Sequence, residues 1–233
     1  SKLLNSALGL TPLRRRLDRF LLEATEPGRL LEIGFGDGSR LDDLTRLGWR
    51  VEGQEVDPVC VRDARKRGLT VHEGPLEGLG LAPGAFDAVV SAHVIEHVED
   101  PEALLRESVR LLRPGGRLVF VTPNTDSYAH RRFRSCWYGL DPPRHLHLFN
   151  PSALAELANR SGLKGFRVVT SPAHASTVLR GSLLIRARRD RPQLAEPTLA
   201  MKLAIAAHLA VARIDHLWNR GSGEELVLAA RSG

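Results

Sequence analysis

Short apolar runs alternate with amphipathic stretches along most of the chain. Runs that are apolar on both faces indicate strands of a buried parallel sheet, and apolar residues three or four positions apart indicate helices. Strands that alternate with helices predict an α/β fold with helices on both faces of the sheet. The predicted strands are residues 29–33, 50–56, 70–74, 86–92, 117–123, 165–171 and 224–232.

Several helix boundaries carry signals of their own. Asp100 and Asn150 each stand directly before a proline, which is the order typical of an N-cap followed by the first helical residue. Residues 199–218 predict a further long helix, and its charged side chains, among them Lys202 and Arg213, make it a poor membrane span.

Composition does not alter the predicted fold class. The hydrophobic fraction of 42% is ordinary for a globular protein, and two cysteines without a CxxC motif fit a reducing, cytoplasmic setting. The net charge of +6 comes mainly from arginines spread along the chain, so we expect no nucleic-acid partner. Arginine clusters at residues 14–16 and 131–134 are candidates for contact with an acidic substrate or, at most, a peripheral membrane surface.

Three glycines follow the first predicted strand in the segment LLEIGFGDGSRL, residues 30–41. Ligands of an open parallel sheet bind beyond the carboxyl ends of its strands, and glycines let a ligand approach the backbone closely. Ser39 stands where a dinucleotide motif G-x-G-x-x-G needs its last glycine, and the phosphate loop G-x-x-x-x-G-K-[ST] is absent. The loop predicts a ligand without identifying it.

Two carboxylates accompany this loop. Glu32 precedes the first glycine and either faces the ligand or caps a loop amide. Glu55 ends the second predicted strand, where a carboxylate can accept both hydroxyls of a ribose. Asp57 is a rival, but the Asp57-Pro58 pair is typical of a helix start, so Glu55 is favoured.

Four features occur in order: the pattern E-x-G-x-G-x-G, the acid that ends the second strand, FDAVVSAHVIEHVEDP and LLRPGGRLVFVTPN. Together they resemble the class I S-adenosylmethionine-dependent methyltransferases over roughly residues 28–172, in particular the bacterial small-molecule group related to the ubiquinone-biosynthesis O-methyltransferases. The resemblance implies a Rossmann-like, seven-stranded, mostly parallel sheet with an antiparallel last strand.

The resemblance also implies one methyltransferase domain over residues 1–233. Its expected parts are an N-terminal helical segment (1–27), a cofactor-binding core (28–172), a helical insert or cap (174–222) and the last strand (224–232). The insert would cover the carboxyl edge of the sheet or form a homodimer surface. The implied cofactor is S-adenosyl-L-methionine, and its expected contacts are Glu32, Gly34, Phe35, Gly36, Gly38, Glu55, Val56, Leu76, Ala92 and His93.

The long segment 124–151 is the expected acceptor side, because long loops in compact domains are often functional. Histidine titrates near neutral pH and suits proton transfer, so His145 is the first candidate for a catalytic role, with His147, His97 and His93 as rivals. The expected substrate-binding residues are Trp137, Tyr138, Asp141 and Arg144.

Structural roles compete with these assignments. Glu96 and His97 are predicted at a helix start, and His145 and His147 are predicted to share one face of a strand. That spacing also allows a metal site, but no third ligand is evident, so no metal is expected.

The expected function is S-adenosylmethionine-dependent O-methylation of a metabolite, a saccharide or a lipid-linked intermediate. RNA or protein methylation and a non-catalytic nucleoside-binding relative are the alternatives. The segment SAHVIEH, residues 91–97, lacks the acid- or asparagine-Pro-Pro-aromatic motif of many enzymes that methylate nucleic-acid nitrogens.

Overall fold

A computed structural model describes residues 26–189, 193 and 196–233, so the predicted helical segment 1–27 lies almost wholly outside the described residues. The chain forms one seven-stranded sheet in the order β3-β2-β1-β4-β5-β7-β6. β7 runs antiparallel to both of its neighbours, which confirms the predicted fold class. The strands are β1 (Arg29–Ile33), β2 (Arg50–Glu55), β3 (Thr70–Glu73), β4 (Phe86–Ala92), β5 (Leu112–Pro123), β6 (Arg167–Ser171) and β7 (Glu225–Arg231).

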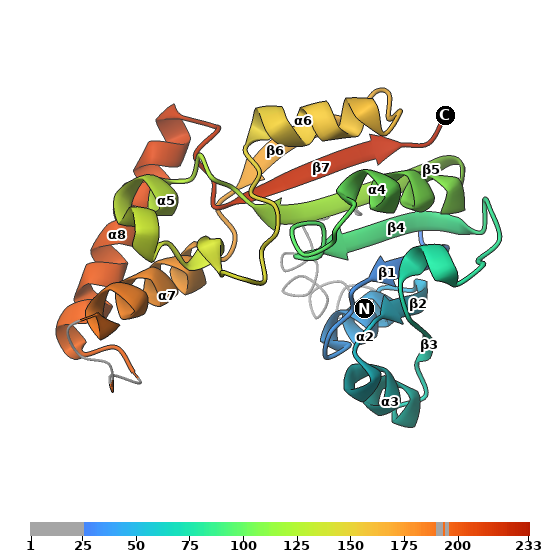
Figure 1. The fold of residues 1–233 in the computed structure, drawn as a ribbon, viewed down its shortest axis with the longest axis horizontal. Coiled ribbons are helices and arrows are strands. Elements are labelled where there is room, and N and C mark those ends of the chain that lie inside the picture. Colours follow the sequence, from blue (N-terminus) through green and yellow to red (C-terminus); the bar gives the residue numbers. More distant parts are fainter. Residues whose placement is uncertain (1–25, 190–192, 194–195) are drawn as a thin grey trace, which may run out of the picture.

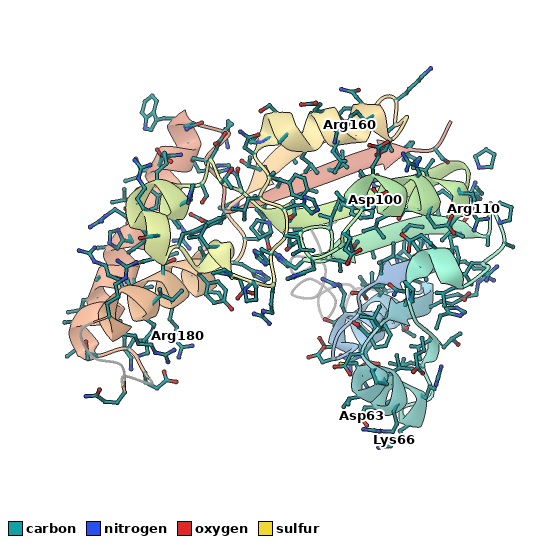
Figure 2. All side chains as sticks on the ribbon, in the orientation of Figure 1. Asp63, Lys66, Asp100, Arg110, Arg160 and Arg180 are labelled. Atoms are coloured by element: carbon teal, nitrogen blue, oxygen red, sulfur yellow. The ribbon has the colours of Figure 1, made fainter. Side chains whose placement is uncertain are left out.

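Three helices begin at their predicted caps. Asp57, Asp100 and Asn150 each accept a backbone amide of the following turn, at 2.8 to 2.9 Å, and Asp100 is labelled in Figure 2. The helices are α2 (Ser39–Arg46), α3 (Pro58–Lys66), α4 (Pro101–Leu111), α5 (Tyr128–Phe133), α6 (Pro151–Arg160), α7 (Ala175–Arg188) and α8 (Leu199–Trp218). Within the described residues, the short 3-10 turns are η3 (Leu76–Gly78), η4 (Arg134–Cys136) and η5 (Tyr138–Leu140).

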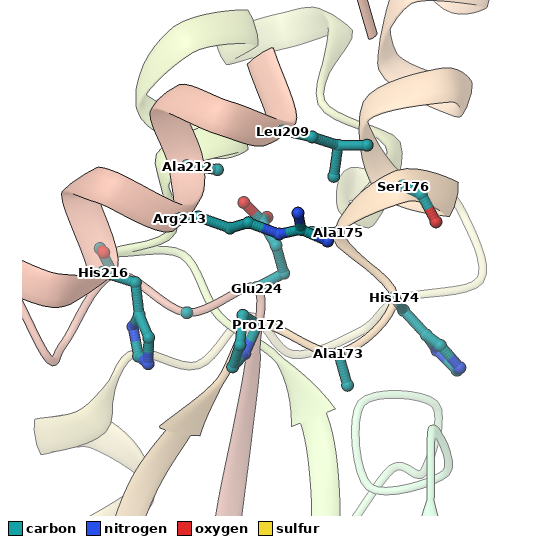
Figure 3. Close-up of a pocket in the computed structure, with 12 residues that line it drawn as sticks. Pro172, Ala173, His174, Ala175, Ser176, Leu209, Ala212, Arg213, His216 and Glu224 are labelled. Atoms are coloured by element: carbon teal, nitrogen blue, oxygen red, sulfur yellow. The ribbon is translucent and has the colours of Figure 1, made fainter. Parts of the chain in front are cut away.

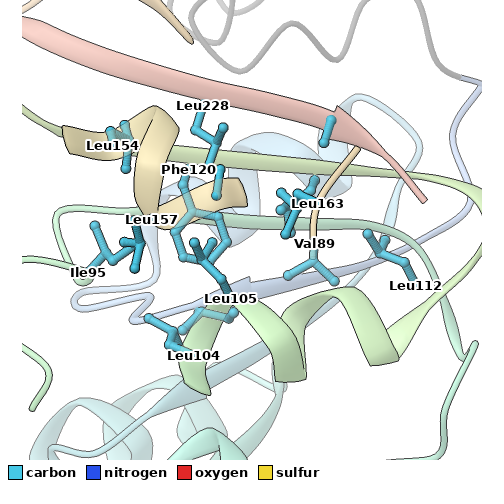
Figure 4. Close-up of a cluster of buried hydrophobic side chains, with 14 of the residues drawn as sticks. Val89, Ile95, Leu104, Leu105, Leu112, Phe120, Leu154, Leu157, Leu163 and Leu228 are labelled. Atoms are coloured by element: carbon cyan, nitrogen blue, oxygen red, sulfur yellow. The ribbon is translucent and has the colours of Figure 1, made fainter. Parts of the chain in front are cut away.

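Two apolar cores hold the sheet between its helices. On one face, α4 and α6 pack their leucines against Phe120 of β5 and Leu228 of β7 (Figure 4). On the other face, Leu44 of α2 packs against Leu30 and Val90. Each such leucine contributes about 1.5–3 kcal/mol when it is fully buried.

Helices α5, α7 and α8 form a lobe beyond the carboxyl ends of β4 and β5 (Figure 1). Its core contains Phe133, Trp137 and Leu179. α8 spans the predicted residues, whereas α7 was not predicted as a separate helix because two of its buried positions, Ala175 and Ser182, carry small side chains that leave a weak apolar pattern. Among the described helices, none combines the length and the apolar character that crossing a bilayer requires.

Candidate active site

A cavity of about 760 Å³ opens at the carboxyl edge of β1 and β2. We call it the donor cavity. Gly34 and Gly36 line it from the loop after β1, Glu55 and Val56 from the end of β2, and Leu76 from η3. With His93, six of the ten predicted cofactor contacts therefore lie around one space large enough for a nucleoside ligand.

The glycine loop is shaped by two different requirements. Gly34 and Gly36 have φ angles of +65° and +58°, a region that favours glycine. A Cβ atom on Gly34 would lie 2.3 Å from Cγ2 of Val94, so this glycine is needed for packing. A Cβ atom on Gly36 would meet no described atom within 4 Å, so this position leaves open space in front of the backbone.

The carboxylate of Glu55 connects the loop to the strand end. Its Oε2 accepts the amide of Gly36 at 2.9 Å, and its Oε1 accepts the amides of Val56 and Asp57 at 2.7 and 3.2 Å. A carboxylate has about four lone-pair sites, so Glu55 retains capacity for a ribose hydroxyl. Asp57 instead caps α3 and is not among the residues that line the donor cavity, so of these two carboxylates Glu55 is the one at the cavity.

Four predicted cofactor residues are not among the described residues that line this cavity: Glu32, Phe35, Gly38 and Ala92. Glu32 is fully buried and pairs with the side chain of Arg40. Phe35 packs in the core between the loop and α3, Gly38 is the N-cap of α2, and Ala92 is buried at the end of β4. These four residues support the walls of the cavity.

A second cavity of about 300 Å³ lies between the sheet edge and the lobe. We call it the acceptor cavity. All four predicted substrate-binding residues line it, together with His145. The sequence missed the contributions of α7 and of the start of β7, which are His174, Thr177, Val178, Glu224 and Glu225. The predicted antiparallel last strand could have indicated the two glutamates. An antiparallel strand begins at the edge of the sheet where the parallel strands end, so its first residues lie near the ligand-binding edge.

His93 and His97 line both cavities and so form their shared wall. Nε2 of His93 lies 3.0 Å from Oε1 of Glu225, and Nδ1 lies 3.3 Å from Oε1 of Glu96. Burial lowers the pKa of His93, but the two carboxylates outweigh this effect and raise the pKa to about 9. His93 is therefore charged at neutral pH and is a poor proton acceptor.

His97 and His145 are oriented differently. Nδ1 of His97 lies 2.9 Å from the carbonyl oxygen of Arg144, and Nδ1 of His145 lies 2.8 Å from the carbonyl oxygen of Gly139. A carbonyl oxygen only accepts, so both Nδ1–H groups donate, and in the neutral form of each ring the lone pair lies on Nε2.

Two local predictions are wrong. His97 lies in a turn rather than at a helix start, with its amide bonded to the carbonyl of Val94 at 2.8 Å, and α4 begins at Pro101. His145 and His147 do not lie on a strand, because the amides of Leu146 and His147 both donate to the carbonyl of Glu96, at 2.8 and 3.1 Å.

The candidate His147 lies apart from the other histidines. Its ring stacks on Phe149, with the ring centroids 6.0 Å apart. In the described part of the chain it is not among the residues that line either cavity. The structure therefore brings His145 together with His97 rather than with His147.

A Rossmann-like sheet with a glycine loop, a strand-end carboxylate and a cavity at its carboxyl edge defines a nucleoside-binding α/β protein. The profile of a methyltransferase domain matches residues 9–168, more than half of the chain. The chain therefore belongs to the class I S-adenosylmethionine-dependent methyltransferases.

Among its relatives is the ubiquinone biosynthesis O-methyltransferase of Xanthomonas oryzae, 37% identical over 103 residues, or 41% of this chain and 43% of that one. The ubiquinone biosynthesis O-methyltransferase of Cereibacter sphaeroides is 33% identical over 147 residues, or 58% of this chain and 60% of that one. The chain thus spans about half the length of the curated relatives it matches.

Solved structures share the fold. An S-adenosylmethionine-dependent methyltransferase of Thermotoga maritima has a TM-score of 0.62 at 22% identity, over 100% of this chain and 97% of that one. Phosphoethanolamine N-methyltransferase 2 of Haemonchus contortus, solved with S-adenosylmethionine, has a TM-score of 0.61 at 19% identity, over 95% of this chain and 52% of that one.

Proposed function

We propose that the chain transfers a methyl group from S-adenosylmethionine to a hydroxyl oxygen of a small molecule in the acceptor cavity. The observation that carries this proposal is that the donor and acceptor cavities share His93 and His97. Methyl transfer needs the two reacting atoms about 3–3.5 Å apart and in line, and adjoining cavities support that arrangement. The similarity to O-methyltransferases supports oxygen as the accepting atom.

S-adenosylmethionine, when bound, supplies a methyl group that the sulfonium charge has already activated. Glu55 is proposed to hold its ribose and the glycine loop its methionine part. The acceptor hydroxyl is proposed to be activated at His97 or His145, where an Nε2 lone pair takes its proton. The acceptor oxygen then bonds to the methyl carbon, and the carbon–sulfur electron pair stays on sulfur.

A third cavity, of about 320 Å³, supports an acidic or lipid-linked acceptor (Figure 3). It shares His174 and Glu224 with the acceptor cavity, so one extended molecule could occupy both. The positively charged side chain of Arg213 reaches into this cavity. Small and apolar side chains form much of the remaining wall: Pro172, Ala173, Ala175, Leu209 and Ala212.

Methyl-labelled S-adenosylmethionine tests the proposal with a panel of hydroxylated metabolites, saccharides and lipid-linked compounds, each as an acidic and neutral pair. We expect label in an O-methyl ether and a preference for the acidic member. Label found only on nitrogen, protein or RNA would overturn the proposal, as would binding of the donor without transfer to any hydroxyl.

The cellular setting is part of the same proposal. Cys60 and Cys136 are both free, which supports a reducing, cytoplasmic location. A homodimer and a peripheral membrane contact remain predictions. α8 leaves Leu203, Ile214 and Leu217 more than half exposed, which would suit either contact. Sedimentation velocity tests the homodimer, and liposome flotation tests the membrane contact.

A further inference from the structure

Three arginines from adjacent strands share one face of the sheet. Arg117 of β5 lies directly across from Arg231 of β7. Arg167 of β6 lies across from Ala229, two positions before Arg231. Residues directly opposite each other point to the same face, and so do residues two positions apart on one strand. Arg117, Arg167 and Arg231 therefore lie together, and we call them the arginine cluster.

The arginine cluster is remote from the candidate active site. Arg117 lies towards the amino edge of the sheet, whereas Pro123 at the carboxyl end of the same strand lines the acceptor cavity. The six residues between these positions span about 20 Å, at about 3.3 Å each. Among the described residues that line the three cavities, no member of the cluster occurs. A ligand held by the cluster would therefore be separate from methyl transfer.

Arg117 is the buried member of the cluster. It is only 7% exposed, and its Nε has no hydrogen-bond partner among the described residues. Burial, together with the positive charges of Arg231 and Arg167, lowers the pKa of its guanidinium. A buried charge is unfavourable unless hydrogen bonds or an opposite charge compensate for it. An oxyanion beside the three guanidinium groups would supply that compensation.

Other arginines of the same sheet are compensated within the chain. Arg29, at the start of β1, donates to Oε1 of Glu52 at 2.7 Å. Arg113, at the start of β5, pairs with Asp87. A carboxylate balances the guanidinium charge at both positions, whereas the neighbouring charges that shift the pKa of Arg117 are cations.

We propose that Arg117, Arg167 and Arg231 bind a phosphate group, either free or carried by a small molecule. A guanidinium is planar, stays charged and presents paired N–H donors that match two oxygens of a phosphate. A phosphate group carries up to two negative charges, so it balances more than one arginine, whereas a carboxylate carries a single charge. The strands are only about 4.8 Å apart, so long side chains from all three reach one group. Bound phosphate would tie β5, β6 and β7 together and stabilise the fold.

Titration of the full-length protein with inorganic phosphate tests the site, with phosphorus NMR and thermal unfolding as readouts and chloride of equal ionic strength as the baseline. Arg231→Gln and Arg167→Gln, at exposed positions, should each weaken binding by at least about 10-fold, as expected for a lost charge-assisted hydrogen bond. Phosphate also stabilises proteins because it is excluded from their surfaces, so a matched control is needed. Arg65→Gln removes the same charge at a partly exposed position, where Arg65 pairs with Glu73.

Arg117→Met provides a second readout with a different sign. Methionine fills much of the same space without a charge, so in chloride the melting temperature should equal or exceed that of the unsubstituted protein. The additional rise that bound phosphate gives the unsubstituted protein should disappear in this variant. A lower melting temperature in chloride, together with unchanged phosphate affinity, would overturn the proposal.

Glycerol phosphate and acetate identify the kind of anion. Tighter binding of glycerol phosphate than of inorganic phosphate assigns the site to a phosphate ester, and the reverse assigns it to free phosphate. Equal binding of acetate would contradict the phosphate assignment. Equal phosphate affinities in Arg231→Gln and Arg65→Gln would contradict the site itself, as would no binding beyond the chloride baseline. Affinity for S-adenosylhomocysteine should be unchanged in all of these variants, which checks that each is folded.

Discussion

The rings of His97 and His145 meet edge to face, with their centroids 4.7 Å apart. One ring comes from the turn after β4 and the other from the loop between η5 and α6. Separate backbone carbonyls hold the two rings, so they form a fixed pair beside the acceptor cavity.

Removal of one ring should therefore impair turnover. We expect His145→Ala to lower kcat by roughly 100- to 10,000-fold, the range typical of a lost proton-transfer or activating group. Steady-state kinetics with an acceptor found in the panel measures this. His147→Ala should stay within a few-fold of the unsubstituted protein, and a loss as large as that of His145→Ala would contradict the assignment.

Donor affinity should depend on Glu55. Glu55→Gln weakens the charge-assisted hydrogen bonds to the loop and to the ribose, so we expect S-adenosylhomocysteine to bind roughly 10- to 100-fold more weakly by calorimetry. Glu73→Gln is the control, because Glu73 ends the neighbouring strand β3 and pairs with Arg65 at a partly exposed position. Equal affinities for the two variants would rule out the proposed role of Glu55.

Gly34→Ala should destabilise the fold beyond the effect of its backbone conformation. The new Cβ would overlap Val94, and overpacking of this kind costs about 1–3 kcal/mol. Gly80→Ala is the matched comparison, because Gly80 has a similar φ of +62° and an added Cβ there meets no described atom within 4 Å. Urea unfolding compares the two variants, and equal free energies of unfolding would refute the packing argument.

Stability should fall between acidic and neutral pH because of Glu224. Burial raises the pKa of this carboxyl from its ordinary value of 4.5 to about 7. The folded chain then binds more protons than the unfolded chain between these values, so its free energy of unfolding decreases as pH rises from about 4.5 to about 7 and levels off above.

Glu224→Gln should remove this contribution, roughly 3 kcal/mol in total. Calorimetric melting at pH 5 and pH 8 measures the difference. Glu156→Gln, at an exposed position on α6, should keep the pH dependence of the unsubstituted protein. An unchanged pH profile in Glu224→Gln would show that other groups cause the dependence.

Features that depend on neighbouring residues were predictable from the sequence. The caps Asp100 and Asn150, the glycine loop and Glu55 at the end of β2 all lie where the pattern indicates. Each of these features is decided within a few residues of the chain, by a side chain that bonds its own helix or by glycines that permit a turn.

Features that join distant segments were not predictable in the same way. The pairing of His97 with His145, and the place of Glu224 and Glu225 in the acceptor cavity, depend on where a loop and an antiparallel strand meet the sheet edge. The alternation of His145 and His147 suggested a strand, but the amides of that segment bond to a single carbonyl instead of to a neighbouring strand. The alternation of residue types along the sequence does not show which carbonyl these backbone amides bond to.

The carbonyl of Glu96 that receives the amides of both Leu146 and His147 has a consequence for exchanging specificity between homologues. An exchange between homologues should therefore transfer the turn at residues 93–97 together with the loop at 139–149. If only one of the two segments were transferred, His97 and His145 would no longer be held beside each other. The helix α7 has to be exchanged with these segments, because Ser182 of α7 accepts the amide of Tyr138 at 2.9 Å and Leu179 of α7 shares an apolar core with Trp137.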